Sequence, residues 1–201
     1  MIIEAIIIGI LIGFIRKGKF SRLEYLKIHL SPLIIVALFS YIAIIVMNLG
    51  LLNFNSRLYT IFLVTTYALI IIVLVFNLDK KFMFIPLIGV MLNFVCMCVN
   101  SFKIPIKSTI IQSVYGSEMS NLLLNGKVKF FIQAEGASLK GLGKIFYLGN
   151  YYFYDVMLSI GDIFIAFGIM FVVQSLMTDK FLKTRDSITL SKSLYKSKRR
   201  H

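Results

Sequence analysis

The chain has 201 residues, 58% of which are hydrophobic, and a mean hydropathy of +0.85. Soluble domains contain roughly 45–50% apolar residues, so this composition excludes an ordinary soluble domain. The net charge of +13 would favour nucleic acid in a soluble protein. Here the basic residues lie between and after the apolar runs, which favours contact with anionic membrane lipids and predicts no nucleic-acid partner.

Five apolar runs predict an all-α integral membrane protein with about five transmembrane helices in one polytopic domain, 1–201. The runs cover 1–15, 32–52, 58–78, 82–99 and 156–177. Most of them approach or exceed the ~20 apolar residues that a helix needs to cross ~30 Å of hydrocarbon. The first run rises only about 22 Å as a helix, so whether it spans completely stays open.

The segment 16–31, between the first two runs, alternates basic and apolar side chains. Its apolar residues, Phe20, Leu23, Leu26 and Leu30, recur at helical spacing. This pattern predicts a helix that lies in the membrane interface.

The segment 100–155 is predicted to be one long extracytoplasmic loop. Its apolar residues between 108 and 124 follow the i, i+3, i+4, i+7 pattern, which predicts one amphipathic helix. Residues 127–134 favour a short strand or another interfacial piece. Tyr and Phe residues between 147 and 154 are typical of an aromatic belt at the head-group level.

The distribution of Lys and Arg predicts the orientation. With five spans and the amino terminus outside, fifteen basic residues lie inside and seven outside. Loops on the inner side carry the excess of Lys and Arg, and long loops count for less. We therefore expect a bacterial plasma-membrane protein with its basic tail, 178–201, in the cytoplasm. If the first run does not span, the same inner faces put the amino terminus inside.

A few polar residues lie at membrane depth, where they are costly and therefore of interest. Asp162 falls about two turns into the last run, as either a structural carboxylate or a ligand or ion site. Asn93 and Asn100 are seven residues apart and share a helix face. Together the three would be polar enough to bind a small ligand, although spacing alone does not prove that their helices touch.

Two stripes of small residues predict close helix packing, either with each other or with a partner. The first consists of Ala5, Gly9 and Gly13, and the second of Gly161, Gly168 and Ser175.

The two cysteines, Cys96 and Cys98, point in different directions from one predicted helix and favour a structural role. Neither His29 nor His201 is placed near them. This differs from the membrane cysteine peptidases that process peptide pheromones, in which a Cys follows a His closely. No disulfide framework, metal site or cofactor is predicted.

Three segments resemble an uncharacterised bacterial family of small multi-pass membrane proteins, the domain-of-unknown-function family numbered fifty-three seventeen. They are the first run closed by 16–23, the segment 92–106, and the segment 159–163. The second is similar to the family's Asn-Gly-Gly-Lys-Met-Pro-Val stretch, with Ser101 and Phe102 replacing the glycines. The resemblance implies an integral membrane protein without an established activity. It emphasises a shared site or structural core, consisting of Asn93, Asn100, Pro105, Gly161 and Asp162.

The motifs in the segments 92–106 and 159–163 both lie on the outer side of the membrane in the predicted topology. This predicts one outward-facing polar pocket, capped by the helix over 108–124. Three functions remain: a non-enzymatic scaffold that binds a membrane-protein partner or a second copy, a small transporter or channel subunit, and a membrane enzyme acting on lipid or peptide. The scaffold is ranked first because no nucleophile and base are paired by the sequence.

Overall fold

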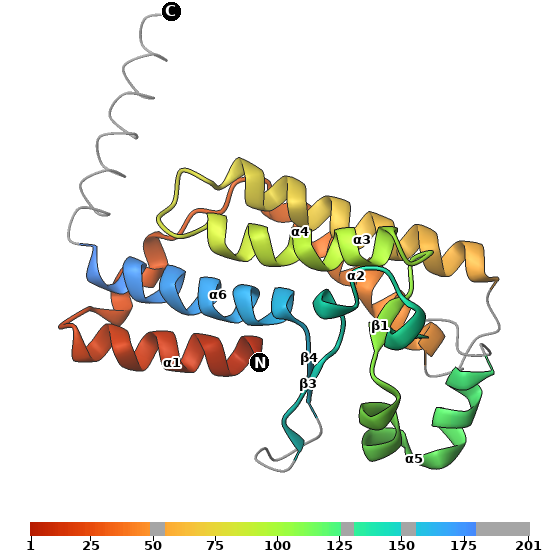
Figure 1. Ribbon diagram of the computed structural model, residues 1–201. Coiled ribbons are helices and arrows are strands. Elements are labelled where there is room, and N and C mark those ends of the chain that lie inside the picture. Colours follow the sequence, from red (N-terminus) through yellow and green to blue (C-terminus); the bar gives the residue numbers. More distant parts are fainter. Residues whose placement is uncertain (49–54, 126–130, 150–155, 180–201) are drawn as a thin grey trace, which may run out of the picture.

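The computed structural model describes residues 1–48, 55–125, 131–149 and 156–179 and is mostly helical (Figure 1). The prediction of a mainly α-helical chain is therefore confirmed. The end of the run 32–52, most of the aromatic segment 147–154, part of the segment 127–134 and nearly all of the basic tail lie outside the described residues.

Five of the six long helices in the described residues begin and end close to the predicted apolar runs, and the sixth covers the predicted amphipathic segment 108–124. They are α1 (Ile2–Ile15), α2 (Ser31–Asn48), α3 (Ser56–Phe76), α4 (Phe84–Cys98), α5 (Ser108–Leu124) and α6 (Ile160–Thr178). Two described helices, over 57–76 and 160–178, are long and apolar enough to cross a membrane. Three shorter apolar helices cover 2–15, 31–47 and 84–99.

The main helix contacts form an open row in the order α1, α6, α4, α3, α2. Gly9 lies against Met170 and Gly13 against Met177, so α1 and α6 run parallel. Gly168 lies against Pro86 and Gly161 against Gly89, so α4 and α6 run antiparallel. The pairs α3–α4 and α2–α3 are antiparallel neighbours joined by short connections. In the second pair, Ile44 near the end of α2 packs with Tyr59 near the start of α3. In this row α1 and α2 are edge helices.

The two stripes of small residues do not face each other. Ala5, Gly9 and Gly13 are buried, and a Cβ on Gly9 would lie 2.8 Å from the Met170 carbonyl oxygen of α6. The glycines of α6 instead face α4. Close backbone approach is therefore achieved twice on α6, on two different sides.

The remaining member of the second stripe, Ser175, donates a hydrogen bond to the Val172 carbonyl oxygen of its own helix, at 3.0 Å. It lines a cavity at the carboxyl end of α6.

The segment after α4 contains two small sheets. Strand β1 (Ile104–Ile106) pairs in parallel with β2 (Phe131–Gln133), with Ile104 opposite Phe131. Strand β3 (Phe146–Tyr147) pairs antiparallel with β4 (Met157–Leu158). Two short 3-10 turns, η2 (Ala134–Gly136) and η3 (Lys140–Leu142), lie between the sheets. A buried cluster of Ile106, Ile110 and Ile111 joins this segment to α5.

The predicted helix over 108–124 is present but kinked. Gly116 adopts φ 81° and ψ −179°, a conformation that glycine adopts without steric cost and that breaks the helix. Helix α5 packs on β2.

The basic segment 16–31 forms a single 3-10 turn, η1 (Phe20–Tyr25), rather than a long interfacial helix. Leu23 and Leu26 pack against a buried cluster of Met83, Val172 and Leu176. The Arg22 guanidinium also donates a hydrogen bond to the Met177 carbonyl oxygen, at 2.8 Å. The segment is therefore fastened to the end of the helix row.

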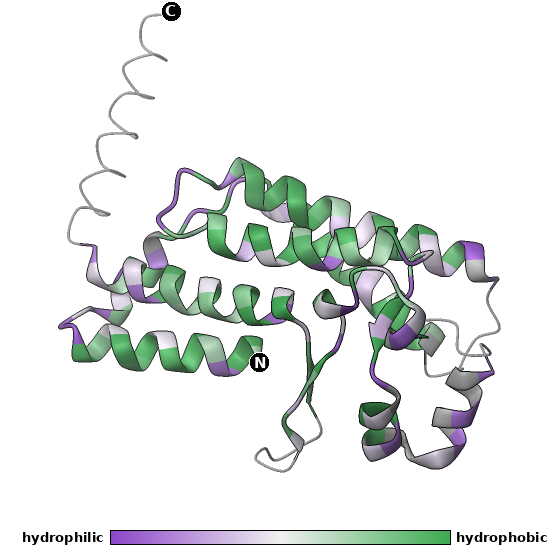
Figure 2. Cartoon of the chain, in the orientation of Figure 1, coloured by the Kyte–Doolittle hydropathy of each residue, from purple (hydrophilic) through white to green (hydrophobic). Residues whose placement is uncertain are grey.

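Large apolar side chains cover the outside of the helices, and polar residues gather near the helix ends (Figure 2). On α1, for example, Ile3 is 71% exposed and Ile15 is 80% exposed, whereas the buried residues are Ala and Gly. A helix on the surface of a soluble protein has the opposite pattern, with its large apolar residues turned inward.

Candidate functional site

Asp162 is held at the start of α6 by a capping box. Ser159 is the N-cap residue, and its hydroxyl accepts a hydrogen bond from the Asp162 main-chain N–H at 3.0 Å. In return, the Ser159 main-chain N–H donates to Asp162 Oδ2 at 2.8 Å. The reciprocal pair satisfies main-chain donors that a helix start otherwise leaves free, and the helix dipole favours a carboxylate there.

Asn93 of α4 completes the contact between the two antiparallel helices. Its side-chain amide donates to Asp162 Oδ1 at 2.9 Å, and its carbonyl oxygen accepts from the Ser159 hydroxyl at 2.7 Å. Gly161 makes this possible, because a Cβ at that position would collide with Asn93 Oδ1 and with the Gly89 carbonyl oxygen.

Lys144 supplies the opposite charge from the segment between α5 and α6. Its ammonium lies 2.5 Å from Asp162 Oδ2, and both side chains are 22% exposed. Its main-chain N–H donates to the Pro105 carbonyl oxygen at 2.7 Å. Asp162 thus has a partner on each carboxylate oxygen, so its charge is compensated within the chain.

Asn93, Ser159, Asp162 and Lys144 form what we call the Asp162 cluster. Asn100 lies just after the end of α4, seven residues beyond Asn93, and also binds the segment between α5 and α6. This buried amide donates to the Cys96 and Ser138 carbonyl oxygens at 2.7 and 2.8 Å. Its own carbonyl oxygen accepts from the Ser138 main-chain N–H at 3.0 Å. Asn100 therefore fixes the segment that leads to Lys144, but it makes no direct hydrogen bond to Asp162.

The turn after Asn100 contains two residues in a backbone conformation that favours glycine. Ser101 has φ 55° and Phe102 has φ 60°, both in the left-handed region that favours glycine. Phe102 packs beside Met97, Ile44 and Leu63.

A cavity of about 40 Å³ adjoins the Asp162 cluster. Tyr67, Cys96, Met97 and Leu142 contribute to its walls together with the polar residues. A volume of this size holds about one water molecule. Its cover comes from residues near 142–144 rather than from α5, which corrects the expectation that the helix over 108–124 caps the pocket.

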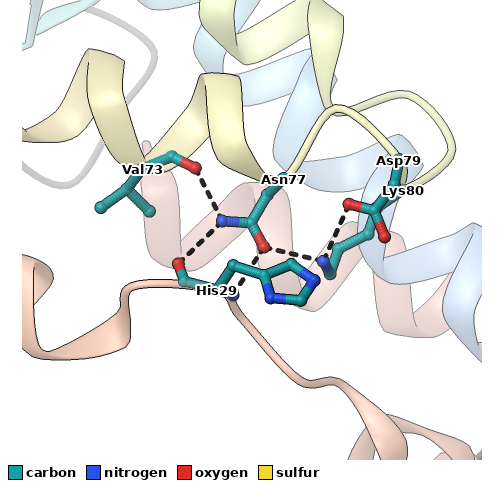
Figure 3. A network of polar contacts seen from close by, with 5 residues as sticks. All are labelled: His29, Val73, Asn77, Asp79 and Lys80. Carbon is teal, nitrogen blue, oxygen red and sulfur yellow. Dashed lines mark hydrogen bonds and ion pairs between the residues drawn. The ribbon is translucent and has the colours of Figure 1, made fainter. Parts of the chain in front are cut away.

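A second polar cluster lies at the other end of the row, where α3 ends (Figure 3). Asn77 is 1% exposed; its amide donates to the Val73 carbonyl oxygen at 2.6 Å and to the His29 carbonyl oxygen at 2.9 Å. Its side-chain oxygen accepts from the His29 main-chain N–H at 2.8 Å and from the Lys80 ammonium at 2.7 Å. The labelled side chains in Figure 3 show how this one amide ties the basic segment to α3.

The structure brings Asn93, Gly161 and Asp162 into direct contact. Asn100 and Pro105 instead hold the segment that delivers Lys144. Sequence reasoning missed Lys144 and Asn77. A signal for Lys144 existed, since an acid at membrane depth is expected to pair, but six bases in the segment 100–155 could have supplied the partner.

Within residues 1–48, 55–125, 131–149 and 156–179, no group of three or more His, Cys, Asp or Glu residues could hold a metal ion. Cys96 is buried and its thiol lies 3.8 Å from the Leu139 carbonyl oxygen, while Cys98 is exposed.

Residues 25–174 match a family of unknown function (DUF5317), and the chain belongs to this family. The family resemblance drawn from the sequence motifs is therefore confirmed. No curated protein and no solved structure matches the chain.

Proposed function

We propose that this DUF5317 protein is a five-pass protein of the bacterial plasma membrane that acts as a non-enzymatic scaffold for another membrane protein. The observation that carries the membrane assignment is the inverted burial of its helices. Small residues lie inside the helix contacts and large apolar residues lie outside. Lipid accepts such a surface without cost, whereas in water it would drive association.

The helix directions support five passes. In the row, α1, α3 and α6 run one way and α2 and α4 the other, as alternating crossings require. Helix α1 is short, yet it lies beside α6 down to Met177, close to the end of that helix. This shared height favours α1 as a complete pass with local adaptation of the bilayer.

The charges support an orientation with the amino terminus outside. The basic residues of the segment 16–27 and of the turn at 80–81 gather at the end of the row where α6 finishes. The basic tail follows α6 directly in the sequence. An excess of Lys and Arg in short loops is typical of the cytoplasmic side.

The satisfied Asp162 cluster supports a scaffold. Hydrogen bonds and an ion pair engage both carboxylate oxygens and fasten the segment 100–158 to the helices. The edge helices α1 and α2 have their main helix contacts on one side only, so a second membrane protein or a second copy can pack there. Figure 1 shows these two helices in the row.

A small transporter or channel subunit is the second candidate, because the Lys144–Asp162 pair borders a cavity at a helix end. The cavity volume of about 40 Å³ favours a stabilising role of the pair over a path for solute. Flux through liposomes containing the purified protein, lost in Asp162→Asn, would favour transport over the scaffold.

The scaffold is tested by co-purification from native membranes in mild detergent, read by mass spectrometry. We expect a stoichiometric membrane-protein partner with the wild type and a reduced yield of it with Asp162→Asn, because that change loosens the outer segment. Lys140→Asn, an exposed change in the same segment, is the matched control and should retain the partner. Recovery of a lone, monodisperse monomer would refute the scaffold.

A further inference from the structure

A cavity of about 250 Å³ lies at the basic end of the row, far along α6 from Asp162. Three elements enclose it: the end of α1, the turn before α4 and the last turns of α6. Its walls include Arg16, Lys81, Phe82, Gln174 and Asp179.

Gln174 is the unexpected residue of this cavity. It is 5% exposed, yet within the described part of the chain its side-chain amide makes no hydrogen bond. The amide atoms are not fully buried, because Gln174 lines the cavity, and a polar group in the cavity can therefore pair with them. The amide N–H of Gln174 can donate to an anionic oxygen.

The charges around the cavity favour an anion. Arg16 and Lys81 both contribute cationic side chains to the walls, and Asp179 offsets one of them through an ion pair with Lys81 at 3.4 Å. The guanidinium of Arg16 offers a fork of donors that matches phosphate oxygens. The start of α4, directly after Phe82 and Met83, adds its positive dipole end.

We propose that this cavity binds the phosphate of an anionic phospholipid head group from the cytoplasmic leaflet. Arg16 and Lys81 hold the phosphate oxygens, and the Gln174 amide donates the third contact. The inference rests on the membrane insertion in the proposed function, and it adds a specific lipid site.

The surroundings distinguish a lipid from a free phosphate compound. Phe82 forms part of the wall, is 41% exposed, and its ring lies 5.6 Å from that of Phe171. Ile15, next to Arg16, is 80% exposed. A phosphate seated in the cavity therefore has apolar surface beside it for acyl chains, which a soluble phosphate would leave unused.

The experiment uses the full-length protein in detergent, offered phosphatidylglycerol or phosphatidylcholine with identical acyl chains and read by native mass spectrometry. We expect one phosphatidylglycerol to be retained preferentially. Arg16→Gln with Lys81→Gln should weaken its retention about tenfold. Gln174→Leu preserves every charge and should weaken it about threefold. Lys107→Gln with Lys140→Gln, two exposed changes near the other end, is the matched control and should bind as wild type.

Three results would overturn the inference. They are equal retention of the two lipids, wild-type binding by Gln174→Leu, and displacement of the lipid by millimolar inorganic phosphate, which would indicate a soluble phosphate ligand. An alkaline wash of the membranes separates this failure from failure of the proposed function. A protein that stays in the membrane without selecting phosphatidylglycerol refutes only the lipid site, whereas a protein that is washed off refutes membrane insertion.

Discussion

Asp162 and Lys144 stabilise each other as a partly buried charge pair beside the polar groups of Asn93 and Ser159. Each side chain is largely covered, and each would carry an uncompensated charge if the other were removed. The pair connects the start of α6 to a segment that arrives by way of two short sheets. Its main effect is therefore on how firmly the segment between α4 and α6 is held to the helices.

We expect Asp162→Asn and Lys144→Met each to destabilise the protein by about 3 kcal/mol, because each leaves one partly buried charge without its partner. The double variant should be more stable than the less stable of the two single variants, since it leaves neither charge without a partner. Thermal unfolding in mild detergent measures this, with Lys140→Met as the control. Additive losses in the double variant would contradict a direct coupling.

Ser101 has a left-handed backbone conformation that glycine would adopt with less strain than serine. It is exposed and has φ 55°, so Ser101→Gly should raise stability by about 1 kcal/mol. Ser113 is an exposed serine within α5, where the same change should lower stability. Both melting midpoints are compared with wild type. A lower midpoint for Ser101→Gly would show that the turn does not adopt this conformation.

At the scale of elements, α6 lies between α1 and α4 in the row and packs closely against both. One side receives α4 through Gly161 and Gly168, and the other receives α1 through Gly9 and Gly13. In the membrane location proposed for this chain, where helices have no hydrophobic driving force to associate, such close packing and the hydrogen bonds from Asn93 supply the attraction.

We expect Gly161→Ala to destabilise the protein by about 1–3 kcal/mol, because the added methyl group forces α4 and α6 apart. Alanine improves helix propensity, but by only about 1 kcal/mol. Gly136→Ala is the control, since a Cβ there meets nothing within 4 Å. Equal melting midpoints for the two variants would contradict the close packing.

The positions of most helices could be predicted from the sequence, because each long apolar run corresponds to one helix. Periodicity could not show that Gly116 breaks α5 or that the segment 16–31 is pinned by Arg22 to the end of α6. The contact between Asn93 and Asp162 depends on which helices are neighbours, and spacing within one helix carries no such information. A basic partner for Asp162 could be expected, but Lys144 could not be chosen among the six bases of the segment 100–155, since its position depends on the path of an irregular segment.

At the scale of the whole molecule, the helix row has two chemically different ends. One end holds the Asp162 cluster and the sheets, and the other collects the basic residues, the Asn77 cluster and the cavity at Gln174. Apolar side chains cover the helices between them. This polarity is the physical basis for the orientation proposed for the chain.

The most direct measurement is the labelling of single cysteines in intact cells with a membrane-impermeant maleimide, on a Cys96→Ala, Cys98→Ala background. We expect Lys140→Cys to be labelled in intact cells and Lys81→Cys to be labelled only after the cells are permeabilised. Both positions are exposed in the structure, so accessibility within the fold does not limit either reaction. Equal labelling of the two positions in intact cells would contradict a membrane-spanning chain with its outer segment and basic end on opposite sides.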